Sequence, residues 1–182
     1  MTETLLGIGR ARPSMRVDRV MVTLQVNGAT HRLAVKPYDV LLDVLREQLG
    51  LTGTRRGCDM GTCGCCTVLL DGRPVLSCLT LALEAEEIPV RTIEGVAGNA
   101  GLHPVQEAFV QTGGSQCGFC TPGFIMTAVA LLERIPDPSE EQIREAISGN
   151  MCRCTGYVAI IEAIRIAAGR LAGAPQVNGA RS

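Results

Sequence analysis

The first half of the chain alternates apolar and other side chains in the manner of β-strands. Every second residue from position 20 to 26 is apolar, and the dipeptide Asn27-Gly28 follows. Asn-Gly after an alternating stretch is a strong signal for a two-residue hairpin turn, so a second strand is expected to carry Leu33 and Val35. Further strands are predicted at residues 67–70, 75–78 and 88–93, the first two joined by a turn at Asp71-Gly72.

One helix is predicted among these strands, over residues 40–49, with Asp39 as its N-cap and Gly50 as its end. Its apolar face consists of Leu41, Leu42, Leu45 and Leu49. Residues 52–66 are rich in glycine and cysteine and predict a loop. Together these elements indicate a small mixed sheet with one packed helix.

Beyond Glu94 the apolar positions follow a helical period. The predicted helices begin at Pro104, at Pro122 with Thr121 as N-cap, at a capping box of Ser139 and Gln142, and after Thr155 as N-cap. The last helix has an apolar face of Val158, Ile161, Ile164, Ala168 and Leu171. Four short helices of this kind predict a bundle, separated from the sheet near residues 94–101.

The composition argues against several classes of function. The chain has 182 residues, with 17 Lys and Arg against 18 Asp and Glu, so it lacks the overall basic charge of a general nucleic-acid binder. Aromatic residues make up 3% and tryptophan is absent, which argues against an RNA-stacking sheet. We see neither a secretory signal nor an apolar stretch of the ~20 residues that span a bilayer. A cytoplasmic location without direct membrane insertion is therefore expected.

Nine cysteines are the unusual feature, and eight of them form two sets of four. The first set has the spacing of a plant-type [2Fe–2S] site, C-x4-C-x2-C followed by a more distant cysteine. Glycines in the surrounding loop let the backbone turn tightly and direct N–H groups at the sulfur atoms, which stabilises an anionic cluster. The members of this set are Cys58, Cys63, Cys66 and Cys78.

The second set consists of two close pairs with 31 residues between them. These pairs are Cys117-x2-Cys120 and Cys152-x-Cys154. Each pair directly precedes a predicted helix start, so two helix N-termini are expected to face one place with their free N–H groups. Such a place suits a negatively charged thiolate cluster.

Other chemistry is compatible with these spacings. Cys-x2-Cys pairs occur in zinc knuckles, although a three-ligand run of x4 followed by x2 and a Cys-x-Cys pair are unusual for zinc. Redox-active dithiols and purely structural clusters are further alternatives. We favour iron–sulfur clusters. No Ser/His/Asp or paired-carboxylate arrangement stands out, so no catalytic residue is assigned.

Four segments carry a family resemblance: GCDMGTCGCCTVLLDG (57–72), SCL (77–79), QCGFCTPG (116–123) and GNMCRCTGY (149–157). In this order and spacing they resemble the small iron–sulfur subunit of the molybdenum hydroxylases, the xanthine dehydrogenase, aldehyde oxidoreductase and carbon monoxide dehydrogenase family. The resemblance covers about residues 20–170. It implies an α+β chain with an N-terminal ferredoxin-like β-grasp domain followed by a C-terminal four-helix bundle domain, each with one [2Fe–2S] cluster.

On this reading the domains are a plant-type ferredoxin-like domain (19–95) and a helical [2Fe–2S]-binding domain (96–172), between an N-terminal extension (1–18) and a flexible tail (173–182). The resemblance implies a partner subunit with a molybdenum–pterin cofactor and usually a second one with FAD. It also implies that Gln116 and Cys154 lie against the pterin, and that electrons pass from it through the helical-domain cluster and the ferredoxin-like cluster towards the flavin or another acceptor.

Two residues depart from the family pattern. Cys65 stands where alanine is usual, and we expect it to be a small buried residue rather than a ligand. Met60 stands where glycine is common. A stand-alone two-cluster ferredoxin and a zinc-binding interaction module are the competing functions, which copurification with a molybdenum protein and iron analysis would distinguish from an electron-transfer subunit.

Overall fold

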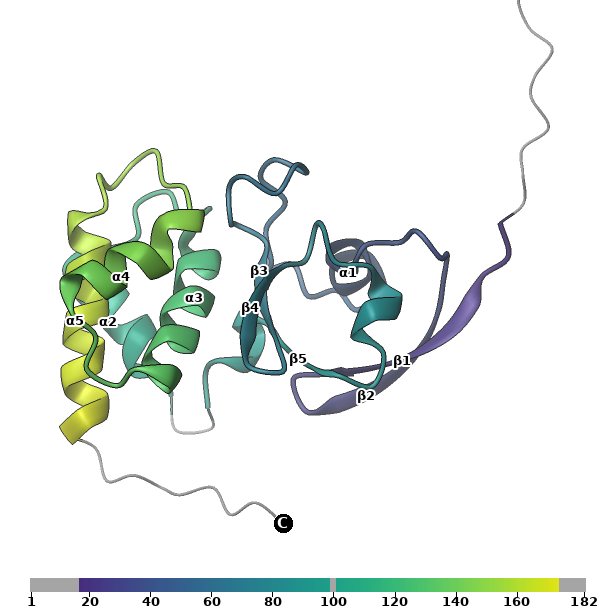
Figure 1. Cartoon of the computed structure of the whole chain (residues 1–182), viewed down its shortest axis with the longest axis horizontal. Coiled ribbons are helices and arrows are strands. Elements are labelled where there is room, and N and C mark those ends of the chain that lie inside the picture. Colours follow the sequence, from purple (N-terminus) through teal and green to yellow (C-terminus); the bar gives the residue numbers. More distant parts are fainter. Residues whose placement is uncertain (1–16, 99–100, 174–182) are drawn as a thin grey trace, which may run out of the picture.

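The computed structural model describes residues 17–98 and 101–173. Most of the predicted N-terminal extension and of the C-terminal tail therefore lies outside the described residues. Within them, the chain forms a sheet-containing half followed by a helical half, which lie side by side (Figure 1). This is the α+β arrangement that the periodicities predict.

Five short strands make one mixed sheet in the order β2-β1-β5-β3-β4. Two hairpins supply four of these strands, and the fifth lies between them, parallel to β1 and antiparallel to β3. Both predicted turns are present: Asn27 and Gly28, like Asp71 and Gly72, all have positive φ angles, as a tight hairpin turn requires. The strands are β1 (Val20–Val26), β2 (Ala29–Val35), β3 (Thr67–Leu70), β4 (Arg73–Leu76) and β5 (Pro89–Arg91).

The predicted helix at 40–49 is irregular. It consists of a single α-turn, α1 (Leu41–Asp43), that continues as the π-helical segment η1 (Val44–Gln48). The prediction of Asp39 as N-cap is wrong: Val40 holds that position, and the Asp39 carboxylate accepts a hydrogen bond from the Lys36 N–H at 2.8 Å. Leu41 and Leu45 are nevertheless buried in a core against the sheet, whereas Leu42 packs on Cys66 and Cys78 and Leu49 is only partly buried. The buried members of this core are Val22, Leu24, Val26, Val35, Leu41, Val44, Leu45, Val68, Ala82, Ala85 and Val90.

Element ends in this half differ from the predictions by a few residues. Strand β4 starts and ends two residues earlier than predicted, because the tight turn allows pairing to begin at Arg73. Strand β5 is shorter than predicted, since Ile93–Gly95 forms the 3₁₀ turn η3. A further 3₁₀ turn, η2 (Ala82–Ala85), has no counterpart in the sequence prediction.

Four helices form the second half, as predicted. They are α2 (Pro104–Thr112), α3 (Thr121–Arg134), α4 (Glu140–Ala146) and α5 (Val158–Gly173). The capping box is confirmed: Ser139 Oγ accepts from the Gln142 N–H, and Gln142 Oε1 accepts from the Ser139 N–H. No helix in the described part of the chain combines the length and apolarity needed to cross a membrane.

Two helices begin at residues other than those predicted from the sequence. Helix α3 includes Thr121, so Cys120 is its N-cap residue. Helix α5 begins only at Val158, and Thr155 instead uses its hydroxyl to bond the Tyr157 N–H and the Cys152 sulfur. Val158 was expected on the inner face of α5, but it is 76% exposed.

The two halves meet where α3 packs on β3 (Figure 1). Leu69 of β3 is 1% exposed and belongs to the helical core, which also contains Phe109, Phe124 and Met126. At the rim of this contact, Nη2 of Arg91 in β5 donates to both carboxylate oxygens of Glu133 in α3, at 2.7 and 2.8 Å. Both partners are partly exposed, so the buried apolar contact rather than this ion pair holds the halves together.

Candidate metal centres

The β3–β4 hairpin brings two cysteines of the first set together. Cys66 directly precedes β3, and Cys78 closely follows β4. Thr67 of β3 pairs with Leu76 of β4, so the two cysteines lie at the same end of the hairpin. Ser77 strengthens this junction, because its N–H and its hydroxyl both donate to the Cys66 carbonyl. Cys66 and Cys78 are buried together against Leu42.

The other two cysteines of the first set lie in the glycine-rich loop, where Cys58 and Cys63 are in hydrogen-bonding contact. The Thr62 hydroxyl and the Met60 N–H are the main donors to Cys58, and they lower the pKa of its thiol to about 6. Burial is the largest cause that raises the pKa of Cys78 to about 11, and contact with Cys66 adds to it. The N–H of Gly61 acts in the opposite direction and lowers this pKa. Backbone N–H groups thus face the sulfur atoms, as the glycine content predicts.

The second set joins the start of α3 to the loop before α5. The sulfur atoms of Cys117 and Cys154 lie 3.7 Å apart. Burial is the largest cause that raises the pKa of Cys120 to about 12, and contact with Cys152 adds to it. The Cys152 sulfur accepts from the Thr155 hydroxyl at 3.1 Å and from its N–H at 3.4 Å. Although burial opposes them, these bonds place the pKa of Cys152 below its ordinary value.

Each set is therefore arranged as two pairs of thiols. The pairs are Cys58 with Cys63, Cys66 with Cys78, Cys117 with Cys154, and Cys120 with Cys152. Over residues 17–98 and 101–173, no three cysteine, histidine or carboxylate side chains form a group that could hold a single metal ion. Paired thiols fit a cluster of two irons, in which each iron takes two thiolates, better than they fit one tetrahedral zinc ion.

Comparison with known proteins assigns this chemistry to a family. Residues 24–92 match the model of the 2Fe-2S iron-sulfur cluster binding domain, and residues 92–165 match that of the [2Fe-2S] binding domain. The nicotinate dehydrogenase small FeS subunit of Eubacterium barkeri is 46% identical over 156 residues, which cover 86% of this chain and 99% of that one. The chain belongs to the small [2Fe–2S] subunits of the molybdenum hydroxylases. It is an electron-transfer subunit of such oxidoreductase complexes.

Solved structures agree with this assignment. Quinoline 2-oxidoreductase from Pseudomonas putida 86 superposes with a TM-score of 0.81 at 43% identity, over 86% of this subunit and 98% of that chain. The aldehyde oxidoreductase of Desulfovibrio desulfuricans ATCC 27774 also superposes with a TM-score of 0.81, at 48% identity. The match covers 84% of this subunit but only 17% of that chain. In that protein the small-subunit fold is thus one part of a much longer polypeptide.

The ninth cysteine of the subunit, Cys65, is buried, as the sequence predicts, with 5% of its surface exposed. Burial is the main cause that raises the pKa of Cys65 to about 12, and Cys63 and Cys120 add to this rise. Because Cys63 belongs to the first set and Cys120 to the second, Cys65 lies between the two sets. Its thiol contacts the Cys63 carbonyl at 3.8 Å. Sequence spacing indicates its burial but not this position between the two centres.

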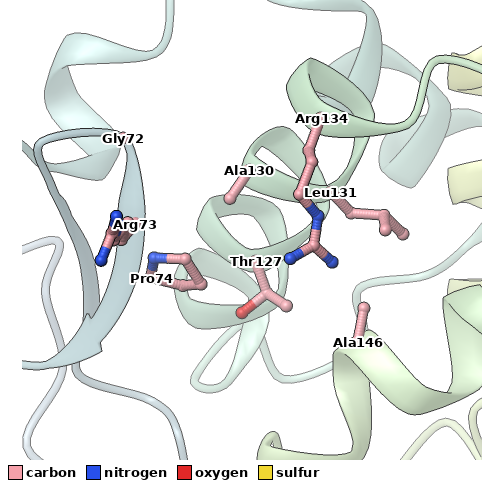
Figure 2. Close-up of a pocket in the computed structure, with 8 residues that line it drawn as sticks. All are labelled: Gly72, Arg73, Pro74, Thr127, Ala130, Leu131, Arg134 and Ala146. Atoms are coloured by element: carbon pink, nitrogen blue, oxygen red, sulfur yellow. The ribbon is translucent and has the colours of Figure 1, made fainter.

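Gln116 is exposed beside Cys117, which is also exposed, in the turn before α3. A cavity of about 170 Å³ opens elsewhere, between the β3–β4 turn and the end of α3 (Figure 2). Arg73 of β4 and Arg134 of α3 lie on opposite sides of it, and none of its lining residues is a cysteine. This cavity is therefore separate from the metal centres.

Proposed function

We propose that the eight paired cysteines are the ligands of the two clusters of the subunit. The arrangement of each set as two thiol pairs, with N–H groups facing the sulfur atoms, is the observation that carries this assignment. Cys58, Cys63, Cys66 and Cys78 would hold the first cluster. Cys117, Cys120, Cys152 and Cys154 would hold the second.

The closeness of the thiols within each set favours binding of a cation. Thiols as close as Cys117 and Cys154 disfavour each other's ionisation, and their contact raises the pKa of Cys154. Bound iron would replace the thiol protons and compensate for the negative charge of the thiolates, so cluster assembly would release protons. Each bound cluster supplies one-electron redox chemistry, and the residues around it tune its potential through hydrogen bonds and burial.

Exposed apolar side chains beside both centres support docking of two partners. Phe119, Met151 and Val158 are 46%, 59% and 76% exposed and lie close in sequence to ligands of the second set or to the start of α5. We propose that a large subunit with the molybdenum–pterin cofactor covers this region, and that Gln116 and Cys154 contact the pterin. Met60 and Leu79, 69% and 60% exposed, lie near the first set, and we propose that an FAD-binding subunit docks there.

Electrons would then enter at the second set, cross to the first and leave towards the flavin or another acceptor. The fusion of this fold into the longer aldehyde oxidoreductase chain supports a permanent large partner. We also propose a cytoplasmic location, because all nine cysteines are free and clustered thiols of this kind are typical of a reducing compartment.

Iron analysis tests the ligand assignment directly. We expect four irons and four labile sulfides per chain, because each of two [2Fe–2S] clusters contains two of each. Reduction with dithionite should produce two distinguishable paramagnetic signals. Stoichiometric zinc, or half of this iron with one signal, would contradict the proposal.

Gln116→Ala tests the contact with the pterin. A primary amide can donate to and accept from a heterocycle edge without adding charge. In the assembled complex, we expect substrate reduction of the second cluster to slow, by roughly 10-fold as for other residues that support a cofactor. Dithionite reduction and iron content should stay unchanged, because Gln116 is exposed and is not a ligand. An unchanged substrate rate with full molybdenum content would contradict the contact.

A further inference from the structure

The loop of the first set and the elements of the second set are in backbone contact at two glycines. Gly64 lies between Cys63 and Cys65, and Gly123 lies in the first turn of α3. A Cβ atom on Gly123 would overlap the Gly64 carbonyl and lie 3.1 Å from the Cys65 Cα. A Cβ on Gly64 would overlap the Gly149 carbonyl and lie 2.9 Å from the Asn150 Cα. Neither position has room for a side chain.

Asn150 adds hydrogen bonds across this contact. It is 4% exposed, and its Nδ2 donates to the Gly64 carbonyl at 3.0 Å, while its Oδ1 accepts from the Thr127 hydroxyl at 2.9 Å. The next residue, Met151, donates its N–H to the Cys63 carbonyl at 2.9 Å. The segment before Cys152 is thus bonded to the loop that carries Cys63. Because Asn150 is buried, its side-chain hydrogen bonds have little competition from water.

Tyr157 holds the same segment from the helical side. Its hydroxyl accepts from the Cys152 N–H at 3.0 Å and donates to the Asn150 carbonyl at 3.2 Å. Its ring packs edge to face on Phe124, with centroids 5.9 Å apart. The Asn150–Cys152 segment therefore has partners on both sides, one in each half of the molecule, and has little freedom to move relative to either centre.

We propose that Asn150 and the Gly64–Gly123 contact set the separation and orientation of the two clusters. This inference rests on the ligand assignment proposed above. With both clusters bound, one electron would pass from the site of Cys117, Cys120, Cys152 and Cys154 to that of Cys58, Cys63, Cys66 and Cys78, with no bond formed or broken. Electron tunnelling falls exponentially with distance and is faster through a bonded route than across a gap, so a small separation of these segments would slow it. Asn150 is accordingly a positioning residue.

Two glycine substitutions provide a matched test in the assembled complex. Gly123→Ala places a Cβ against Gly64, whereas Gly149→Ala places one where no atom lies within 4 Å, although Gly149 is adjacent to Asn150. Asn150→Ala removes the hydrogen bonds without adding bulk and decides the question if Gly123→Ala fails to fold. For each protein we would measure iron content, the magnetic interaction between the two clusters after full dithionite reduction, and the rate of equilibration between them. The rate would come from rapid-freeze EPR after one-electron reduction by methyl viologen radical.

We expect Gly123→Ala and Asn150→Ala to keep both clusters, to weaken the magnetic interaction and to slow equilibration by about 10-fold or more. Gly149→Ala should match the wild type in all three measurements. A wild-type magnetic interaction and rate in either of the first two variants would overturn the inference, because a merely stabilising contact would lower thermal stability without changing these readouts. Equal losses in Gly149→Ala would overturn it as well. If the wild type itself lacks two iron signals, the ligand assignment fails first, and that outcome is visible before any variant is made.

Discussion

Cys66→Ser is expected to remove one cluster and leave the other. Cys66 is 2% exposed, contacts Cys78 and directly precedes β3 of the sheet. A serine hydroxyl is a much poorer iron ligand than a thiolate, since it does not ionise at neutral pH and is a harder donor. The iron content should therefore fall to about half, with one paramagnetic signal lost. Electron flow through the complex should stop, because the remaining cluster would have no electron acceptor.

Cys65→Ala is the matched control, because it changes the neighbouring cysteine of the same loop. Cys65 is buried, its thiol contacts the carbonyl and the thiol of Cys63, and alanine fits in the same space. Both signals and full iron should persist. Loss of a cluster in Cys65→Ala, or retention of both in Cys66→Ser, would show that Cys65 is a ligand. Loss of both clusters in a folded Cys66→Ser protein would show that the two sets share ligands.

Gly64→Ala is expected to produce a large loss of stability. Gly64 has a φ angle of +67°, which costs a residue with a side chain about 1–2 kcal/mol. The added Cβ would also meet the backbone at Gly149 and Asn150, and overpacking of this kind costs a further ~1–3 kcal/mol. With ~2–4 °C per kcal/mol for a chain of this size, the midpoint of thermal unfolding should fall by roughly 10 °C.

Gly72→Ala separates the two causes. Gly72 has a φ angle of +73°, but a Cβ there would have no atom within 4 Å. This variant should lose only the ~1–2 kcal/mol of the left-handed conformation. Thermal unfolding followed by the visible absorbance of the clusters would compare the two. Equal midpoints for Gly64→Ala and Gly72→Ala would mean that the contact between the loop and the helical half adds nothing to stability.

The sequence predicts features that depend on neighbours along the chain. Asn27-Gly28 and Asp71-Gly72 form the expected turns, since both residues of each pair tolerate positive φ angles. Ser139 and Gln142 form the expected capping box, since its donors and acceptors belong to one helical turn. The cysteine spacing indicates the number of centres and the kind of metal for the same reason. A C-x4-C-x2-C loop brings its own sulfur atoms together.

Element details escaped prediction where a different partner nearby in the sequence competes for the side chain expected to cap the helix. Asp39 has the right residue type for an N-cap, but the Lys36 N–H takes its carboxylate. Thr155 likewise uses its hydroxyl for Cys152 and Tyr157, and α5 begins later than its position indicates. Val158 fits the apolar period of α5, yet it is 76% exposed at the start of the helix, whereas Ile160 and Ile161 are buried. Periodicity identifies a helix face but not where along the helix the core ends.

The sequence alone thus determined the two-part α+β organisation, the two sets of four cysteines and the resemblance to a family, because hydrophobic period, turn residues and ligand spacing are all local properties. Only the tertiary structure decided which thiols pair, that Cys65 lies between the sets, and that Gly64, Gly123 and Asn150 join them. The bond from Asn150 to the Gly64 carbonyl spans 86 residues of sequence. No spacing rule connects positions so far apart, because their contact exists only after α3 has packed against β3 and buried the core between the two halves.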